Sequence, residues 1–238
     1  MCVWIEKFRY ECKCLNENIM KKIIVFCVAF LATMSLWALE TSVKNAYGVE
    51  IWYDFDDESN IARVTYKGFY SYEYDEYTGE VVIPSTVTYG GEEYRVTSIG
   101  NGAFDDCSSL TSITIPESVT EIGGGAFYGC SSLTSITIPE GVTSIGENTF
   151  SFCGSLTSIT IPEGVTSIGP NAFSYCGSLT SVTIPSGVTT IGDWAFDSCD
   201  SLTSITIPES VTSIGSDAFW GCSSLTSITC KNTTPPTL

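Results

Sequence analysis

Six cysteines recur at a fixed interval of 23 residues, and they are the first residues in the sequence whose type and spacing suggest chemistry. They are Cys107, Cys130, Cys153, Cys176, Cys199 and Cys222. Segments stacked at the usual strand spacing lie ~4.8 Å apart, which is within the Cα range of a disulfide. Equivalent side chains of a stack point in parallel, however, whereas a disulfide needs Cβ atoms ~3.8 Å apart. We therefore expect a column of reduced, buried thiols in preference to a redox or metal ladder.

A second column at the same interval consists of carboxylates. Its members are Glu117, Glu140, Glu163 and Glu209, with Ser186 in place of the acid in one copy. Like charges stacked this closely repel each other, so they need full solvation or a shared cation. We expect a solvated acidic edge, and a weak calcium site is the alternative.

The overall composition restricts the function further. The chain has no histidine, which removes the usual general base and the commonest metal ligand. It carries 27 Asp and Glu against 10 Lys and Arg, a net charge of −17. This charge argues against binding to nucleic acid or to an anionic membrane and favours basic partners. We predict no catalytic activity and no cofactor.

The columns must be positioned by a repeated element. The phrase SLTSITIPEGVTSIG begins at Ser132 and returns almost unchanged at Ser155, and close variants begin at Ser109, Ser178 and Ser201. Its Leu-x-x-Ile-x-Ile pattern is the strand signature of a leucine-rich repeat. Alternation predicts that Ile113 and Ile115 face a core and that the residues between them face solvent. One coil cannot bury its apolar faces alone, so stacking is required.

Each 23-residue coil is expected to contain four parts. A strand ends at a proline such as Pro116, because proline cannot donate a ladder hydrogen bond. A turn and a short extended segment through residues 119–122 follow. Gly123 and its copies are interpreted as turn positions with positive φ. The segment AFYGC is long enough for one helical or 3-10 turn before the chain returns. The predicted fold is a β-rich solenoid.

The segments outside the regular repeat have their own expected roles. Residues 39–100 are predicted to form an amino-terminal β cap with the first irregular repeat, including two strands around a turn at 57–60 and a hairpin at Gly90-Gly91. Residues 101–230 form the solenoid. Residues 231–238 form a carboxyl-terminal tail without an amphipathic closing element, which leaves a truncated chain as an open alternative.

The amino end has the pattern of an export signal. Lys21 and Lys22 precede fourteen mostly apolar residues, and a small residue follows at Ala38. This describes a signal peptide over 20–38, and the apolar run is shorter than the ~20 residues of a membrane-spanning helix. Residues 1–19 are interpreted as an upstream extension. We expect a secreted or cell-surface protein that is not inserted in the membrane after the signal is removed.

Residues 81–230, with the unit SLTSITIPEGVTSIGxxAFxxC, resemble the BspA-like leucine-rich repeats of bacterial surface and secreted proteins. This resemblance implies a binding protein, often one that adheres to host or neighbouring-cell proteins. The ligand varies among members, so the resemblance identifies no particular partner. A structural scaffold role in a larger surface assembly is the alternative. The oligomeric state is open.

Two surfaces are candidates for binding. The exposed strand face forms a regular array of hydroxyls, including Ser158, Thr160, Ser181 and Thr183. Such an array suits protein or glycan contact, and ice binding is a remote alternative. Aromatic residues near the Ala-Phe turns vary between copies, and they are Tyr128, Phe152, Tyr175, Trp194 and Trp220. Tyr and Trp are frequent interface anchors, so we expect recognition of a protein partner of basic character to involve Tyr175, Trp194 and Trp220.

Overall fold

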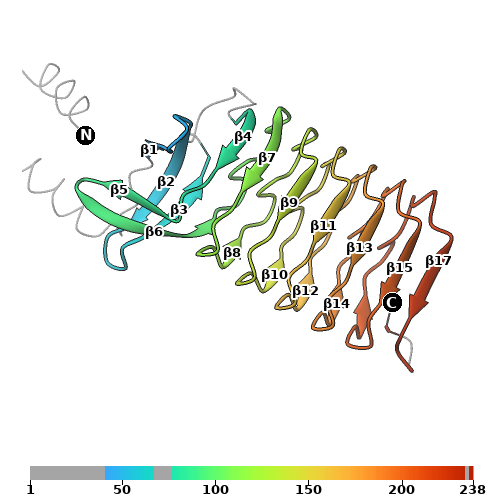
Figure 1. Cartoon of the computed structure of the whole chain (residues 1–238). Helices are drawn as coiled ribbons and strands as arrows, with labels where there is room; N and C mark the ends of the chain where they lie inside the picture. The colour runs from blue at the N-terminus through green and yellow to red at the C-terminus, as the bar shows by residue number, and fades with distance from the viewer. Residues whose placement is uncertain (1–40, 67–76, 234–235, 238) are drawn as a thin grey trace, which may run out of the picture. The chain divides into compact units, whose positions relative to one another are not determined.

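The computed structural model of the protein describes residues 41–66, 77–233 and 236–237 (Figure 1). The predicted extension and signal peptide lie outside these residues. Within the described ranges the chain forms strands and tight turns and no helix. From residue 79 onward, successive coils of the chain stack on one another, and each coil has three sides.

The first side of the solenoid is built from parallel strands, one per coil. They are β4 (Gly79–Val82), β7 (Leu110–Thr114), β9 (Ser135–Thr137), β11 (Ser158–Thr160) and β13 (Ser181–Thr183) in one sheet, and β15 (Ser204–Ile207) with β17 (Ser227–Cys230) in another. Neighbouring strands pair residues that are one repeat apart in the sequence, so Ile136 lies beside Ile159. In β9, β11 and β13 the central apolar residue is buried and its neighbours are exposed. The predicted alternation is confirmed.

The second side consists of two-residue strands in parallel register. They are β8 (Glu121–Ile122), β10 (Ser144–Ile145), β12 (Ser167–Ile168), β14 (Thr190–Ile191) and β16 (Ser213–Ile214). The last four form one sheet in chain order. Their isoleucines point into the core, so the short extended segment expected within each coil is present.

The third side is a ladder of tight turns where the sequence predicted a helical turn. The Ala126 amide donates to the Gly123 carbonyl at 3.2 Å, whereas the Phe127 amide donates to Thr149 of the next coil at 2.9 Å. Local and inter-coil hydrogen bonds alternate in this way along the side. Gly125 and Gly129 have φ of 62° and 69°. A left-handed residue at every fourth position is incompatible with a helix, which corrects the prediction.

The glycine that opens each turn has a different role from the one expected. Gly123 and its copies do not have positive φ. A Cβ on Gly192 would lie 2.5 Å from the Pro170 nitrogen and 2.6 Å from the Gly169 carbonyl carbon. These glycines therefore allow close approach to the backbone of the preceding coil. The interpretation of Gly123 as a positive-φ position is wrong.

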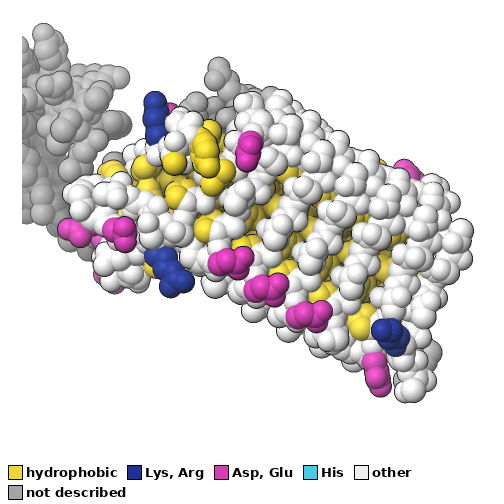
Figure 2. Space-filling model, viewed as in Figure 1, with side chains coloured by type: hydrophobic (Ala, Val, Ile, Leu, Met, Phe, Trp, Pro, Cys, Tyr) yellow, Lys and Arg dark blue, Asp and Glu magenta, His cyan; other side chains and the backbone are white. Residues whose placement is uncertain are grey.

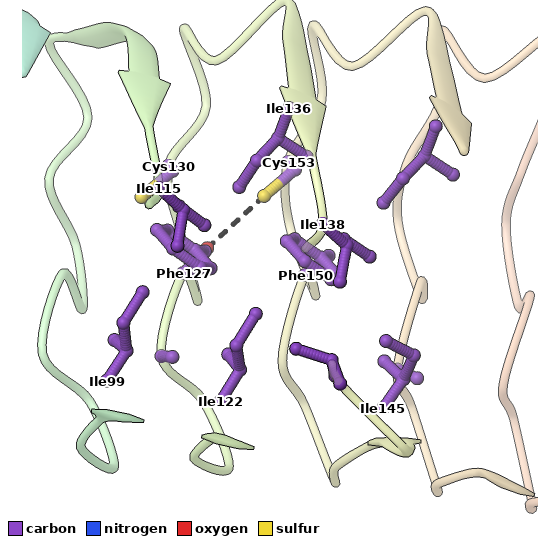
Figure 3. Packing of buried hydrophobic residues seen from close by; sticks show 14 of the residues in the cluster. Ile99, Ile115, Ile122, Phe127, Cys130, Ile136, Ile138, Ile145, Phe150 and Cys153 are labelled. Carbon is purple, nitrogen blue, oxygen red and sulfur yellow. Dashed lines mark hydrogen bonds between the residues drawn. The ribbon is translucent and has the colours of Figure 1, made fainter. Parts of the chain in front are cut away.

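The core between the three sides is continuous along the stack. One phenylalanine per coil stacks on the next, and the Phe127 and Phe150 rings are 5.4 Å apart and nearly parallel (Figure 3). The thiol of Cys153 donates to the Phe127 carbonyl oxygen at 3.2 Å. The same bond recurs from Cys130, Cys176, Cys199 and Cys222 to the phenylalanine carbonyls at 3.1–3.2 Å.

An additional sheet precedes the regular coils. It contains β1 (Thr41–Lys44), β2 (Glu50–Asp56), β3 (Ile61–Thr65), β5 (Thr86–Tyr89) and β6 (Glu92–Ile99), and β6 also pairs with β8 of the solenoid. β2 and β3 flank the expected turn at 57–60. β5 and β6 form the expected hairpin, in which Gly90 and Gly91 have φ of 63° and 94°. A capping role for this sheet stays a prediction.

The last coil is less covered than the others. All four residues of β17 are exposed, including Ile228 at 49%. Part of the predicted tail returns beside β16, where Thr237 forms a parallel bridge with Ser213. The Ile214 amide donates to the Thr237 carbonyl at 2.9 Å.

Candidate functional site

The hydroxyl array lies on the strand side, as the alternation predicted. Ser158 pairs with Ser181 and Thr160 with Thr183, and all four side chains are exposed. Figure 2 shows this face as mostly uncharged, with acidic side chains in a row along one margin. The array is nearly the same in every coil, so it offers repeated contacts with little discrimination.

Another threonine column on the strand side was not singled out from the sequence. The hydroxyl of Thr157 donates to the Thr134 carbonyl at 3.3 Å, and that of Thr180 donates to the Thr157 carbonyl at 3.2 Å. Similar bonds occur on the second side, where Thr189 donates to the Thr166 carbonyl. These hydroxyls connect successive coils. The 23-residue recurrence of these threonines could have indicated that they form a column. Only the strand register in the structure shows which carbonyl oxygen accepts a hydrogen bond from each hydroxyl.

The acidic column is exposed, as expected. The carboxylates of Glu117, Glu140, Glu163 and Glu209 are all accessible to solvent. The Ser186 hydroxyl lies 3.5 Å from the Glu163 carboxylate. In the described part of the chain, no group of three or more Cys, Asp or Glu side chains is arranged to hold a metal ion.

Five of the six cysteines in the column are buried, and Cys222 is half-buried. The buried members are Cys107, Cys130, Cys153, Cys176 and Cys199, and no disulfide joins any two of the described cysteines. Burial raises the pKa of the Cys176 thiol from 9.0 to about 12 and raises the pKa of Cys130 and Cys153 as well. A protonated, inaccessible thiol is a poor nucleophile and a poor metal ligand. The expected burial is confirmed for five of the six thiols, and their low reactivity stays a prediction.

Three of the aromatic candidates form a contact cluster on the turn side. The rings of Phe152 and Tyr175 stack with centroids 4.5 Å apart at 4°. Tyr128 packs edge-on against Phe152 at 5.3 Å. Phe152 is 42% exposed and Tyr175 is 48% exposed. The cluster is therefore stacked on itself and open to solvent.

The other two aromatic candidates lie on later coils of the same side. Trp194 is 38% exposed and Trp220 is 64% exposed. Backbone bonds place them in adjacent coils, because the Ser198 amide, four residues after Trp194, donates to the Trp220 carbonyl at 2.7 Å. We define Tyr128, Phe152, Tyr175, Trp194 and Trp220 as the aromatic turn face.

The backbone conformation of the aromatic turn face was not visible in the sequence. Phe152, Tyr175 and Trp194 have φ of 61°, 58° and 57°. Bulky residues rarely adopt this left-handed conformation. The equivalent positions of other coils hold small or polar residues, which are Gly102, Gly125, Asn148, Asn171 and Asp217 in one column and Asp106, Gly129, Ser198 and Gly221 in the other.

The described residues contain no helix that is both long enough and apolar enough to cross a membrane. The stacked coils, with one buried leucine and paired short strands per 23 residues, define a leucine-rich repeat solenoid. A family model described as BspA type Leucine rich repeat region, in 6 copies, matches residues 68–200 and 143–235. The chain belongs to this family, which confirms the resemblance seen in the sequence.

Solved structures of bacterial proteins agree with the family. A leucine-rich repeat protein from Bacteroides ovatus is 42% identical over 75% of this chain and 45% of its own, with a TM-score of 0.68. A leucine rich cell surface protein from Faecalibacterium prausnitzii is 35% identical over 82% and 56%, with a TM-score of 0.60. The leucine rich repeat protein of T. pallidum is 32% identical over 76% and 80%, with a TM-score of 0.65.

The chain spans about half the length of the first two of these proteins. A search of curated proteins gave no match.

Proposed function

We propose that this protein is a secreted or surface-exposed module that binds a protein partner and has no catalytic activity. Its family consists of leucine-rich repeat proteins, and the similar protein from F. prausnitzii is described as a cell surface protein. Binding is assigned to the aromatic turn face, chiefly Tyr175 and Trp194.

The observation that carries this proposal is the left-handed backbone of three exposed aromatic residues. A side chain in this conformation costs about 1–2 kcal/mol relative to its ordinary conformation. The neighbouring coils fill the same columns with glycine, Asn, Asp or Ser, so folding does not require a ring there. Stacking of Phe152 on Tyr175 recovers only part of this cost, about 0.5–1.5 kcal/mol. A contact with a partner explains why exposed rings occupy strained positions.

The negative charge of the chain indicates that the partner is a basic protein. The chain has a net charge of −17, and its exposed carboxylates include the column of Glu117, Glu140, Glu163 and Glu209, which only Ser186 interrupts. A basic protein would be attracted at long range and would associate faster at low salt. A nucleic acid would be repelled, because its binding depends on cationic side chains.

The test compares two double variants of the chain, one on each candidate surface. In the first, Tyr175→Gly and Trp194→Asn restore residue types that other coils have at the same positions. In the second, Thr160→Gln and Thr183→Gln alter the exposed strand face. Immobilised chains are offered cell-surface and matrix proteins, and captured proteins are identified by mass spectrometry.

We expect a partner that is captured by the wild type and by the strand-face variant and is lost with the aromatic variant. Both variants are first compared with the wild type by circular dichroism. Loss of the partner only with the strand-face variant would move the site to the hydroxyl array.

A scaffold role is the second candidate, and the exposed strand β17 favours it. Among the described residues β17 pairs with β15 alone, and all four of its residues are accessible. Such an edge can pair with another chain. This function predicts self-association of the wild type and capture of no other protein, which light scattering and the same capture experiment distinguish.

A further inference from the structure

Asp197 is a buried carboxylate that lies next to the aromatic turn face. Its side chain is only 5% exposed, whereas Asp105, at the equivalent position of an earlier coil, is exposed. Of the three intervening coils, the first has Tyr128 at this position and the other two have the small hydroxyls of Ser151 and Ser174, which are both buried. A charged group has thus replaced a neutral one at a buried position of a single coil.

Among the described residues, the contact that offsets the charge of Asp197 is a hydrogen bond from its neighbour. The Ser198 hydroxyl donates a hydrogen bond to Asp197 Oδ1 at 3.1 Å. Among the described residues no lysine or arginine forms an ion pair with it, and the ion pair found there joins Lys44 to Glu50 on the preceding sheet. A buried carboxylate without a cationic partner is costly, so a cation supplied from outside would stabilise it.

The backbone places Asp197 between exposed aromatic residues. The Tyr175 amide donates to the Asp197 carbonyl at 2.8 Å, and the Asp197 amide donates to the Trp194 carbonyl at 3.0 Å. The next residue, Ser198, donates its amide to Trp220 of the following coil. The carboxylate therefore belongs to the coil that separates Tyr175 from Trp220.

The aromatic stack ends at this coil. Phe152 covers one face of the Tyr175 ring. Ser198 follows Tyr175 in the same column, one repeat later, and its side chain is too small to continue the stack. With coils ~4.8 Å apart, a planar group laid on Tyr175 above Ser198 would occupy the next position of the stack.

We propose that this position receives an arginine side chain of the protein partner. A guanidinium is planar and weakly hydrated, so it can stack on an aromatic ring while it keeps its charge. Asp197 supplies the opposite charge, and exposed Asp200 lies three residues further along the same coil. A lysine would satisfy the charge but would not continue the stack. This inference rests on the proposed function, because it names the group of the protein partner that Tyr175 and Trp194 contact.

Fluorine NMR of the full chain labelled with 5-fluorotryptophan tests the proposal. The probe is the peptide acetyl-Gly-Arg-Gly-amide, and the control peptide has citrulline, which is planar but uncharged, in place of arginine. Signals are assigned by replacing each tryptophan with phenylalanine in turn. We expect the arginine peptide to shift the signals of Trp194 and Trp220 and to leave that of Trp52, on β2, unchanged.

Variants identify the groups responsible. Asp197→Asn keeps the shape of the side chain and is expected to weaken binding of the peptide by about tenfold, as the loss of one charged contact implies. Tyr175→Gly removes the stacking surface and is expected to weaken binding as well. Asp105→Asn changes the equivalent position of an earlier coil and should leave the affinity unchanged. Unfolding curves confirm that each variant folds.

Equal binding of the citrulline peptide, or wild-type affinity in both Asp197→Asn and Tyr175→Gly, would overturn the arginine site. Equal shifts at Trp52 would also overturn it, because they indicate non-specific binding. These outcomes leave the proposed function standing if the aromatic variant still loses the captured protein. If that variant keeps the captured protein, the proposed function fails on its own test.

Discussion

Phe152 and Tyr175 stack face to face across one repeat, with ring centroids 4.5 Å apart, while both residues have a left-handed backbone. The stack follows from the register, because residues 23 apart occupy the same place in adjacent coils. A buried column of phenylalanines stacks in the same manner inside the solenoid. The same geometry therefore produces a core in one column and an exposed surface in another.

The two aromatic columns should differ sharply in their contribution to stability. Phe173→Ala leaves a cavity in the core and should lower the free energy of unfolding by about 3–5 kcal/mol. Tyr175→Gly loses stacking but relieves backbone strain, so its effect should stay within about 1 kcal/mol. Urea unfolding measures both. A loss of several kcal/mol in Tyr175→Gly would show that the exposed stack is needed for folding.

Two glycines provide a matched test of the contact between coils. A Cβ on Gly192 would press on the backbone of Gly169 and Pro170, whereas a Cβ on Gly177 meets nothing within 4 Å. Gly192→Ala should therefore lower the free energy of unfolding by about 1–3 kcal/mol. Gly177→Ala should leave it unchanged or raise it by up to about 1 kcal/mol. Equal effects in the two variants would contradict the close approach of the coils.

The thiols should differ in reactivity according to their burial. Cys230 is exposed and Cys222 is half-buried, whereas Cys130, Cys153 and Cys176 are buried. Under native conditions maleimide should label Cys230 first and the buried thiols very slowly, and denaturant should make them all reactive. Mass spectrometry of the digested protein measures the extent of labelling at each cysteine. Disulfides between successive members of the column would show that the register is different.

Alkaline pH should destabilise the solenoid through the same thiols. Burial raises the pKa of Cys176 from 9.0 to about 12, so the folded state holds a proton that the unfolded state releases. Its contribution to stability is complete below pH 9 and is lost as the pH rises towards 12. The free energy of unfolding should fall by up to about 1.4 kcal/mol per pH unit for this thiol. Urea titrations at several pH values should give a smaller slope for Cys176→Ala, and an unchanged slope would contradict the assignment.

The export signal can be tested by the mass of the secreted protein. Residues 20–38 have a cationic start and a short apolar run, so we predict cleavage after Ala38 and a mature chain that begins at Leu39. Intact-mass analysis of material released from an expressing bacterium checks this. Secreted protein that retains the first 38 residues would exclude the predicted cleavage.

The sequence by itself determined the repeat and much of the fold. The 23-residue recurrence identified the parallel strands, the family, the buried cysteines and the exposed hydroxyls, because each of these depends on which residues share a column. The hairpin at Gly90-Gly91 and the turn at 57–60 were also predicted, since local turn chemistry fixes them.

Only the tertiary structure decided features that depend on contact between coils. The third side is a turn ladder because its amides alternate between local carbonyls and those of the next coil, such as Thr149 for Phe127. Position 192 requires glycine because a Cβ there would press on the backbone of the preceding coil, and no local sequence pattern reveals this contact. The positive φ of Tyr175 and the burial of Asp197 likewise arise from stacking. The 23-residue period predicts which residues will be neighbours in adjacent coils. The backbone angles and the distance between coils determine which of these residues are strained, buried or available to a partner.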